Sequence, residues 1–537
     1  MGRRILFALL LLCLPTPALA LQGTVYRDSD QNAVRDPGEP GLAGVVVSNG
    51  RDVVTTDAEG GFRLTGGSET FVRVTCPDDH RCPHWHRRGG GDFGLLPQAT
   101  PDDFFFVHVS DIHAYDQEGD FLAWSSPPIP AWMPDRLAYW LLLFRLGRVY
   151  PHLSRAQIAD EFRAELSRYR SVDELSDAAL IGAYGDEFQR PGSGLGRVEE
   201  RIRAALGEVA ALEPALVIST GDLILEGNQA PPPVVERWLR FYREATEATG
   251  VPWVNTIGNN EIAGLQNADV RHDDPRFGKY FFEETYGPTW FSFDRGRFHF
   301  VALDTHAPDP EESNPKSWLF TLMPEDEAAW LEADLALHGD RVVVALNHEP
   351  FAADPDWPFA DDIEPAEGGE ILTRHGVSYT LTGHVHWNGL VREGPTTHIS
   401  TGALSGLRWI VPRSVHPRGY RLVYAHSGRL YSAWKEIGRP VLGFVVPEGS
   451  PTIAPASGAP GMGTREVVAV AADVRGPFAE VELTLAGEPL PLERWGRFFF
   501  RAELPEALEP EAELVLRTVG IDGSVTRTRL TAGEAVP

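Results

Sequence analysis

Five apolar runs in this chain each end in a short polar cluster, and this recurrence constrains the fold more than any other feature. The first run, Phe104 to Val109, precedes Asp111 and His113. Short apolar runs of this kind are typical of buried strands, and ligands bind beyond the carboxyl ends of strands in open α/β sheets. One such end alone is typical of an ordinary turn, whereas five favour a shared site. The other four runs lead to Gly221-Asp222, Gly258-Asn259-Asn260-Glu261, Asn347-His348 and Gly383-His384-Val385-His386.

Segments with helical periodicity separate several of these runs. The spacing of apolar residues predicts helices over 196–212, 234–249 and 325–338, each followed by an apolar run. Residues 290–294 and 297–304 read as a hairpin joined by Arg295 and Gly296. Alternation of strands and helices predicts βαβ units and therefore an α/β fold.

Length and charge limit the classes of function. A chain of 537 residues is too long for one ordinary domain, and its formal net charge is −28. Such an acidic chain repels nucleic acid and anionic bilayers, so nucleic acid is not an expected partner and an exported nuclease is disfavoured. A charged phosphate substrate would need a local cationic site, which bound metals supply.

The first twenty residues have the features of a secretory signal. Arg3 and Arg4 precede an apolar run over 5–14, and the segment closes with Ala18-Leu19-Ala20. We therefore expect residues 1–20 to be a signal peptide and the mature protein to be secreted or periplasmic. No other run is long enough to span a bilayer.

Residues 21–100 are predicted to form an N-terminal β-sandwich with an acidic loop between its first two strands. Oxygen-bearing groups recur in this loop at the spacing of a calcium site, although Ala33 replaces the glycine usual at the sixth position. The alternative is a solvated acidic loop without calcium. The candidate ligands are Asp28, Asp30, Asn32, Val34 (through its carbonyl), Asp36 and Glu39.

Two cysteines remain after the signal segment. In an oxidising compartment, Cys76 and Cys82 are expected to form a disulfide. The nearby residues His80, His84 and His86 leave a zinc site open as the alternative.

The rest of the chain divides by composition. A central domain is expected over 101–438, a Pro/Gly-rich linker over 439–460, and a C-terminal β-sandwich over 461–537. An aromatic-rich helical insertion is expected over 116–194. It is either a subdomain that buries its own aromatic side chains or a lid over the site, in which case a lipid-like or aryl substrate fits.

The ordered set of polar clusters resembles the calcineurin-like metallophosphoesterase family, and the flanking β-regions resemble its exported members with N- and C-terminal β-domains. The resemblance implies a four-layer α/β/β/α sandwich flanked by two small all-β sandwich domains. It implies two divalent metal ions, each of them Mn, Fe or Zn, sharing Asp222. The implied ligands are Asp111, His113 and His386 on one ion, and Asn259, His348 and His384 on the other.

The resemblance also implies the activity. A metal-bridging hydroxide would hydrolyse a phosphodiester or phosphomonoester bond in a small-molecule or lipid-like substrate. The sequence does not specify the oligomeric state. The alternative from another class is a metal-binding but catalytically inactive surface or adhesion protein, in which the β-domains carry the function.

One residue departs from the pattern of the family. Asn260 occupies the position where the family usually has a histidine that assists the leaving group. An amide can donate a hydrogen bond but cannot deliver a proton, so substrates with low-pKa leaving groups are expected to react best. His306 is the candidate for a substitute acid, and a hydrogen-bonded loop residue is the alternative for this position.

Overall fold

The computed structural model describes residues 20–101, 103–115, 198–355, 364–404, 418–445, 466–474, 478–504, 511–521 and 523–531. Contacts divide the chain into two compact units, Met1–Gln98 and Ala99–Pro537. The expected signal peptide, the expected insertion at 116–194 and residues 446–460 of the expected linker lie outside the described residues. Within the described ranges, no helix is long and apolar enough to cross a membrane.

The first unit consists of two four-stranded sheets around an apolar core. One sheet has the order β4-β1-β8-β6, formed by Gly61–Thr65, Ala20–Arg27, Phe93–Pro97 and His80–Arg81. The other has the order β3-β2-β5-β7, formed by Val53–Thr55, Val46–Ser48, Phe71–Val74 and His86–Arg88. In β4, Phe62 and Leu64 are buried while Arg63 and Thr65 are exposed, which is the alternation of a strand with one face on a core.

The second unit begins with a five-stranded sheet in the order β11-β10-β9-β20-β21. Its strands are Trp253–Thr256, Val217–Thr220, Phe104–Val109, Gly419–His426 and Arg429–Glu436. Strands β9, β10 and β11 are parallel, with Val217 paired to both Val107 and Trp253. Their carboxyl ends therefore meet at one edge of the sheet.

A six-stranded sheet faces the first one. Its order is β12-β13-β16-β17-β19-β18, formed by Phe291–Arg295, Phe298–Ala302, Val342–Leu346, Tyr379–Thr382, Thr396–Ser400 and Leu390–Glu393. Strands β13, β16, β17 and β19 are parallel. The predicted hairpin is confirmed as β12 and β13, which are antiparallel. A short hairpin, β14 (Ala307–Pro308) and β15 (Trp318–Leu319), follows β13.

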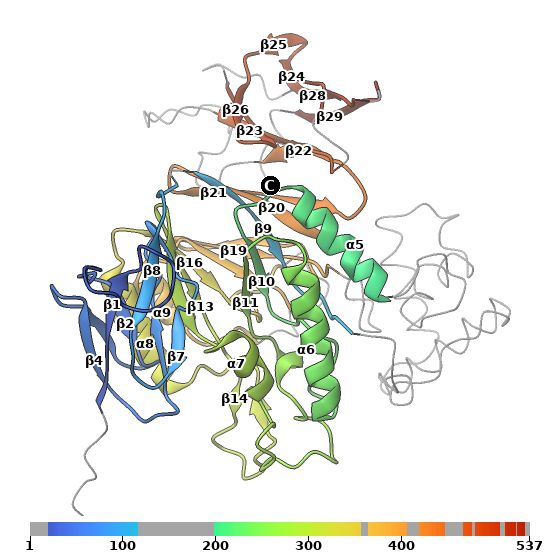
Figure 1. Cartoon of the computed structure of the whole chain (residues 1–537). Helices are drawn as coiled ribbons and strands as arrows, with labels where there is room; N and C mark the ends of the chain where they lie inside the picture. Colours follow the sequence, from blue (N-terminus) through green and yellow to red (C-terminus); the bar gives the residue numbers. More distant parts are fainter. Residues whose placement is uncertain are drawn as a thin grey trace, which may run out of the picture. The chain divides into compact units, whose positions relative to one another are not determined.

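Aromatic contacts join the two sheets, and helices cover their outer faces. The Phe104 ring of β9 lies 5.8 Å from the Phe298 ring of β13. Helices α5 (Val198–Ala211), α6 (Pro232–Glu247) and α7 (Tyr280–Tyr286) share one core with β9 and β10, and Figure 1 shows α5 and α6 beside them. Helix α8 (Glu325–Leu337) contacts β13 through Asp334 and His299, and α9 (Gly369–Arg374) precedes β17.

Two further four-stranded sheets follow in the same unit. Their orders are β22-β23-β27-β26 (Val441–Val445, Glu466–Ala472, Phe499–Glu503, Glu493–Trp495) and β25-β24-β28-β29 (Glu488–Leu490, Glu480–Leu485, Glu513–Val519, Val525–Thr531). They enclose a small core that includes Leu483 and Leu514. The expectation of an α/β core with additional β-sheets on both sides in the sequence is confirmed.

Candidate metal centre

The polar clusters of the sequence lie at the carboxyl ends of parallel strands in both sheets. Residues 111–113 follow β9, residue 222 follows β10 and the 3-10 helix Asn259–Glu261 follows β11. On the facing sheet, His348 follows β16, and residues 384–386 follow β17. Hydrogen bonds and ion pairs connect the seven predicted metal ligands into one continuous group.

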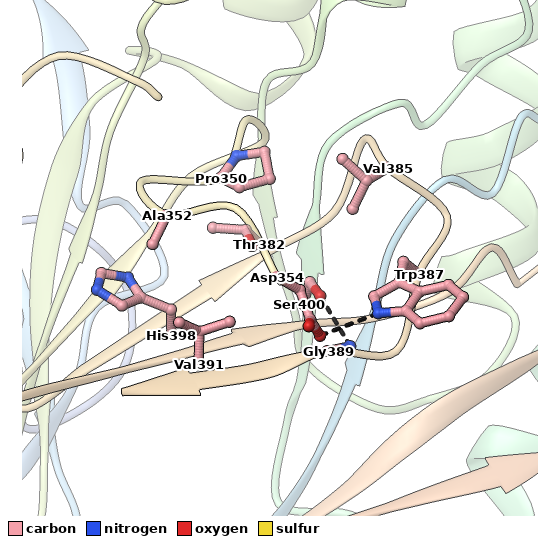
Figure 2. Close-up of a pocket in the computed structure, with 10 residues that line it drawn as sticks. All are labelled: Pro350, Ala352, Asp354, Thr382, Val385, Trp387, Gly389, Val391, His398 and Ser400. Atoms are coloured by element: carbon pink, nitrogen blue, oxygen red, sulfur yellow. Dashed lines mark hydrogen bonds between the residues drawn. The ribbon is translucent and has the colours of Figure 1, made fainter. Parts of the chain in front are cut away.

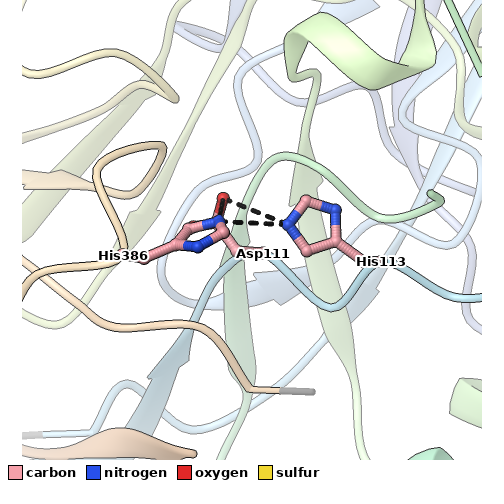
Figure 3. A group of neighbouring side chains, drawn as sticks. All are labelled: Asp111, His113 and His386. Atoms are coloured by element: carbon pink, nitrogen blue, oxygen red, sulfur yellow. Dashed lines mark hydrogen bonds and ion pairs between the residues drawn. The ribbon is translucent and has the colours of Figure 1, made fainter. Parts of the chain in front are cut away.

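Asp111, His113 and His386 form the buried part of this group (Figure 3). Nε2 of His386 lies 3.0 Å from Oδ1 of Asp111 and 3.1 Å from Nε2 of His113. Two imidazole nitrogens approach this closely only when one carries a proton or when both face a shared cation. One carboxylate and two imidazoles therefore form a donor set that fits a transition metal.

Asn259, His348 and His384 form a second group of donors, which is more open to solvent. Oδ1 of Asn259 lies 3.2 Å from Nε2 of His348 and 3.2 Å from Nδ1 of His384. Nδ1 of His348 donates to the carbonyl of Thr220 at 2.7 Å, which directs Nε2 toward the other two donors. His348 is buried, Asn259 is half-buried and His384 is exposed, so this side of the centre is accessible to a substrate.

Asp222 lies between the two groups. Its Oδ2 is 4.0 Å from Nδ1 of His113, and its Oδ1 is 3.3 Å from Nε2 of His348. Asn260 holds this carboxylate, with its backbone N–H donating to Oδ1 and its side-chain amide donating to Oδ2, both at 3.0 Å. Asp222 thus presents one carboxylate oxygen to each donor group.

Backbone strain is concentrated at these loops. Five of the seven predicted ligands have positive φ angles between 48° and 64°, a region that residues with a side chain rarely adopt. Such strain persists where the surrounding structure holds the backbone, and it is concentrated at functional sites. The five residues are Asp111, His113, Asp222, His384 and His386.

The glycines of the polar clusters are required by close packing. A Cβ atom on Gly258 would lie 2.3 Å from the backbone nitrogen of Asp222. Gly221 has a φ of +89°, and a Cβ there would lie 2.6 Å from Nδ1 of His348. A larger residue at either position would displace a predicted ligand.

The electrostatics of the centre favour ionised carboxylates. Burial disfavours the charge on Asp222, but the neighbouring imidazole of His348 holds the pKa of Asp222 below its usual value. Burial likewise opposes a charge on His348, yet Asp222 raises the pKa of that imidazole well above its usual value. Burial lowers the pKa of His113 to about 4, so this ring is neutral at pH 7, as metal ligation requires.

Glu261 stabilises the loops that carry the donor groups. Its carboxyl group is completely buried and accepts hydrogen bonds from the backbone N–H groups of Ile224 at 3.0 Å and Gly258 at 2.8 Å. Burial and the charge of Asp222 raise the pKa of Glu261 to about 8. This side chain therefore ties the loop of Asp222 to the loop of Asn259.

The two candidate leaving-group residues are both buried, in different surroundings. The side-chain amide of Asn260 lies within the centre, 3.2 Å from Nδ1 of His113. His306 lies between two carboxylates, with Nδ1 3.1 Å from Asp304 and Nε2 2.8 Å from Glu349. Since both ring nitrogens are occupied, the geometry favours the hydrogen-bonded alternative for His306, and its role as an acid stays a prediction.

Two residues near His306 were not among the sequence-based candidates. Glu349 directly follows His348, and its position in the same polar cluster is a signal that could have identified it. Lys279 donates to Asp304 at 2.5 Å, and nothing in the local sequence indicates this contact.

A small pocket lies beside the loop that carries His384 and His386 (Figure 2). Val385, between these two histidines in the sequence, lines the pocket together with Trp387 and Pro350. The indole N–H of Trp387 donates to Asp354 at 2.9 Å. None of the seven predicted metal ligands lines this pocket, so it is distinct from the donor groups.

The remaining candidates lie in the first unit. Cys76 and Cys82 form a disulfide. In the acidic loop, carboxylate oxygens of Asp28, Asp30 and Glu39 lie within 4.8 Å of one another, while the side-chain amide of Asn32 donates to Asp30 and Asp36. Calcium binding by this loop, with Val34 as a carbonyl ligand, stays a prediction.

Known proteins resemble parts of this chain. A curated relative, a "Probable cyclic nucleotide phosphodiesterase" of Moraxella catarrhalis (strain BBH18), is 23% identical over 219 residues, which are 40% of this chain and 71% of the relative. Two solved structures resemble the chain with TM-scores below 0.5. The first is GAP50, the anchor in the inner membrane complex of Plasmodium, with a TM-score of 0.31 and 9% identity, covering 63% of this chain and 86% of that one. The second is the phosphopantetheinyl hydrolase PptH of Mycobacterium tuberculosis, with a TM-score of 0.24 and 16% identity, covering 35% of this chain and 79% of that one.

The family profile described as "Calcineurin-like phosphoesterase" matches residues 106–388, more than half of the chain. This range contains both donor groups and Asp222. The chain therefore belongs to the calcineurin-like phosphoesterase family.

Proposed function

We propose that the protein is an exported, two-metal-dependent phosphoesterase that prefers phosphodiesters to phosphomonoesters. The observation that carries this proposal is the position of Asp222, whose two carboxylate oxygens face different groups of nitrogen and oxygen donors. A shared carboxylate between two donor sets is what a pair of divalent ions requires. The mixed imidazole, carboxylate and amide donors suit Mn, Fe or Zn.

Each donor group would hold one ion. Asp111, His113 and His386 would hold the buried ion, and Asn259, His348 and His384 the ion nearer to solvent. When bound, the two ions supply an activated water and the positive charge that phosphoryl transfer needs. The solvent-facing position of His384 and Asn259 supports the approach of the phosphoryl group from that side.

Asn260 supports a preference for esters with good leaving groups. Its side-chain amide donates to Asp222 and has no proton to give to a leaving group. A proton supplied by a general acid is typically worth about 10²–10⁴ in rate, and its loss is most costly for leaving groups of high pKa. Aryl esters and other esters with good leaving groups would therefore be favoured. The printed name of the Moraxella relative, a probable cyclic nucleotide phosphodiesterase, separately supports a diester as the substrate.

Export is supported by two independent features. The first twenty residues have the charge and apolar pattern of a secretory signal. The disulfide between Cys76 and Cys82 is of the kind that persists in an oxidising compartment. A secreted or periplasmic enzyme would act on extracellular or periplasmic phosphate esters, either small molecules or lipid-like ones.

Hydrolysis of model substrates tests the proposal. Metal-stripped protein reconstituted with Mn²⁺ is expected to hydrolyse bis-p-nitrophenyl phosphate with a higher kcat/KM than p-nitrophenyl phosphate, and Asp222→Asn is the inactive control. Bound metal without hydrolysis of either ester would instead favour the inactive surface or adhesion protein.

A further inference from the structure

Glu349 lies at the edge of the donor group that opens to solvent. It follows His348 at the end of β16 and is only 3% exposed. One of its carboxylate oxygens and one ring nitrogen each of His348 and His384 lie within 4.8 Å of one another. A carboxylate and two imidazoles in this arrangement form a donor set of their own.

Neighbouring side chains hold this carboxylate in place. Oε1 of Glu349 lies 2.8 Å from Nε2 of His306, and Oε2 accepts a hydrogen bond from the Thr305 hydroxyl at 3.1 Å. Asn347 donates to that hydroxyl at 3.2 Å and also to the Glu349 carbonyl at 2.8 Å. Ligating carboxylates in metal sites are typically oriented by outer hydrogen bonds of this kind.

His306 connects Glu349 to two further charged residues, Asp304 and Lys279. Its Nδ1 lies 3.1 Å from Asp304, whose other oxygen accepts a bond from Lys279. The charges along this chain of contacts alternate, and all of its members except Lys279 have fully buried or nearly fully buried side chains. Burying these charged groups costs free energy, because each charge must be desolvated. A buried network of this kind is therefore expected to serve a function.

We propose that Glu349 is a further carboxylate ligand of the ion held by Asn259, His348 and His384. This inference rests on the proposed two-metal function. Metal–ligand bonds of about 2.0–2.2 Å place opposite ligand atoms about 4.2 Å apart, so only a small side-chain movement is needed. An added carboxylate makes this donor set harder and thereby favours Mn²⁺ over softer ions.

A titration of metal-stripped full-length protein with Mn²⁺, followed by calorimetry, tests the assignment. Glu349→Gln keeps the size and one acceptor oxygen but removes the charge. We expect this variant to bind one of the two ions more than ~100-fold more weakly and the other as in the wild type, since outer-shell partners alone contribute about 10–100-fold to affinity.

Glu332→Gln is the matched control. Glu332 lies on α8, where it pairs with Arg374 and His375 at the surface, and the variant makes the same change in charge. We expect both of its Mn²⁺ affinities to equal those of the wild type. If Glu349→Gln does not fold, as judged by circular dichroism, Glu349→Asp decides, because the shorter side chain withdraws the oxygen and is expected to weaken the same ion.

The outcomes separate this inference from the proposed function. A loss of less than ~100-fold in the affinity of Glu349→Gln for both ions would overturn the ligand assignment and leave the phosphoesterase intact, since outer-shell partners alone account for a loss of that size. The wild type could also bind two Mn²⁺ ions, and Glu349→Gln could weaken the binding of one of them, while no ester is hydrolysed. That result would support Glu349 as a ligand and overturn the proposed enzymatic activity. A wild-type protein that binds no Mn²⁺ would overturn both.

Discussion

The side-chain amide of Asn260 donates to Oδ2 of Asp222 at 3.0 Å, so the residue that replaces the usual histidine of the family is bound to the carboxylate between the two donor groups. The backbone N–H of Asn260 binds the other oxygen of the same carboxylate. Asn260 therefore orients Asp222 with two hydrogen bonds, and its effect on the leaving group is separable from this structural role by substitution.

Asn260→His is expected to raise kcat/KM by about 10-fold or more for esters with poor leaving groups. For p-nitrophenyl esters, kcat/KM should change little. The new imidazole can deliver a proton, which matters only when the leaving oxygen is strongly basic. The measurement is a series of diesters with leaving groups of graded pKa. Asn260→Ala, which also loses the contact with Asp222 but adds no acid, should lower all rates by a similar factor. If Asn260→His changes kcat/KM by the same factor for every leaving group, the imidazole does not act as an acid toward the leaving group.

Asp222→Asn is expected to weaken metal binding by more than about 100-fold, because a shared ligand should matter more than outer partners worth about 10–100-fold. Inductively coupled plasma analysis of the purified protein should show fewer than two ions per chain. Gln229→Ala serves as a control, since Gln229 binds Asn267 through its backbone carbonyl and no hydrogen bond joins its side chain to a predicted ligand among the described residues. Full metal occupancy in Asp222→Asn would contradict a shared position for this carboxylate.

The seven predicted ligands could be recognised from the sequence because each follows a strand end directly. Parallel strands bring their carboxyl ends to one edge, so the sequence position of Asp111 or His348 already specifies where the side chain will lie. The helix predicted over 196–212 is confirmed as α5, Val198–Ala211, because its apolar face gives a strong period. The metal roles of the ligands themselves stay predictions.

Contacts between distant segments could not be predicted in this way. Lys279 and Asp304 lie 25 residues apart, and Lys435 and Glu208 lie 227 residues apart. Each of these residues reads locally as an ordinary surface charge. Only the packing of α5 against β21, or of the Lys279 segment against the end of β13, turns them into buried partners. Charge pairing across elements leaves no periodic signal in a single sequence.

Lys435→Met is expected to destabilise the second unit by about 3–5 kcal/mol, the usual cost of leaving a buried charge without its partner. Lys435 is completely buried and donates to Glu208 at 2.6 Å, while the Tyr420 hydroxyl and the Gly438 N–H bind the same carboxylate. Chemical denaturation followed by tryptophan fluorescence measures the change.

Arg240→Met provides the comparison for Lys435→Met. Arg240 pairs with Glu236 at 3.6 Å on the exposed face of α6, with both side chains more than half exposed. Exposed pairs of this kind contribute less than about 1 kcal/mol. Equal effects of the two substitutions would show that the Lys435–Glu208 pair does not stabilise the packing of α5 against the sheet.

The buried imidazole of His299, which belongs to neither donor group, is expected to make the stability of the protein depend on pH. His299 of β13 is completely buried and lies 2.7 Å from Asp294 through Nδ1 and 2.7 Å from Asp334 through Nε2. Burial opposes its positive charge, but Asp334 and Asp294 together raise its pKa to about 9. The His338 ring stacks on it with a centroid distance of 3.7 Å.

Because the pKa of His299 is raised in the folded state, its contribution to stability is fully present below its unfolded value near 6.5 and is lost as the pH rises through about 9. We expect the free energy of unfolding to fall by about 2–3 kcal/mol between pH 6.5 and 9.5 from this group, since one pKa unit corresponds to about 1.4 kcal/mol. Asp334→Asn removes the largest attraction and should flatten this part of the profile, whereas Glu332→Gln at the surface of the same helix should leave the slope unchanged. Asp334 is a direct partner of the His299 ring, so its substitution must change the titration of that ring. Identical slopes in the wild type and Asp334→Asn would therefore show that His299 is not the group that titrates.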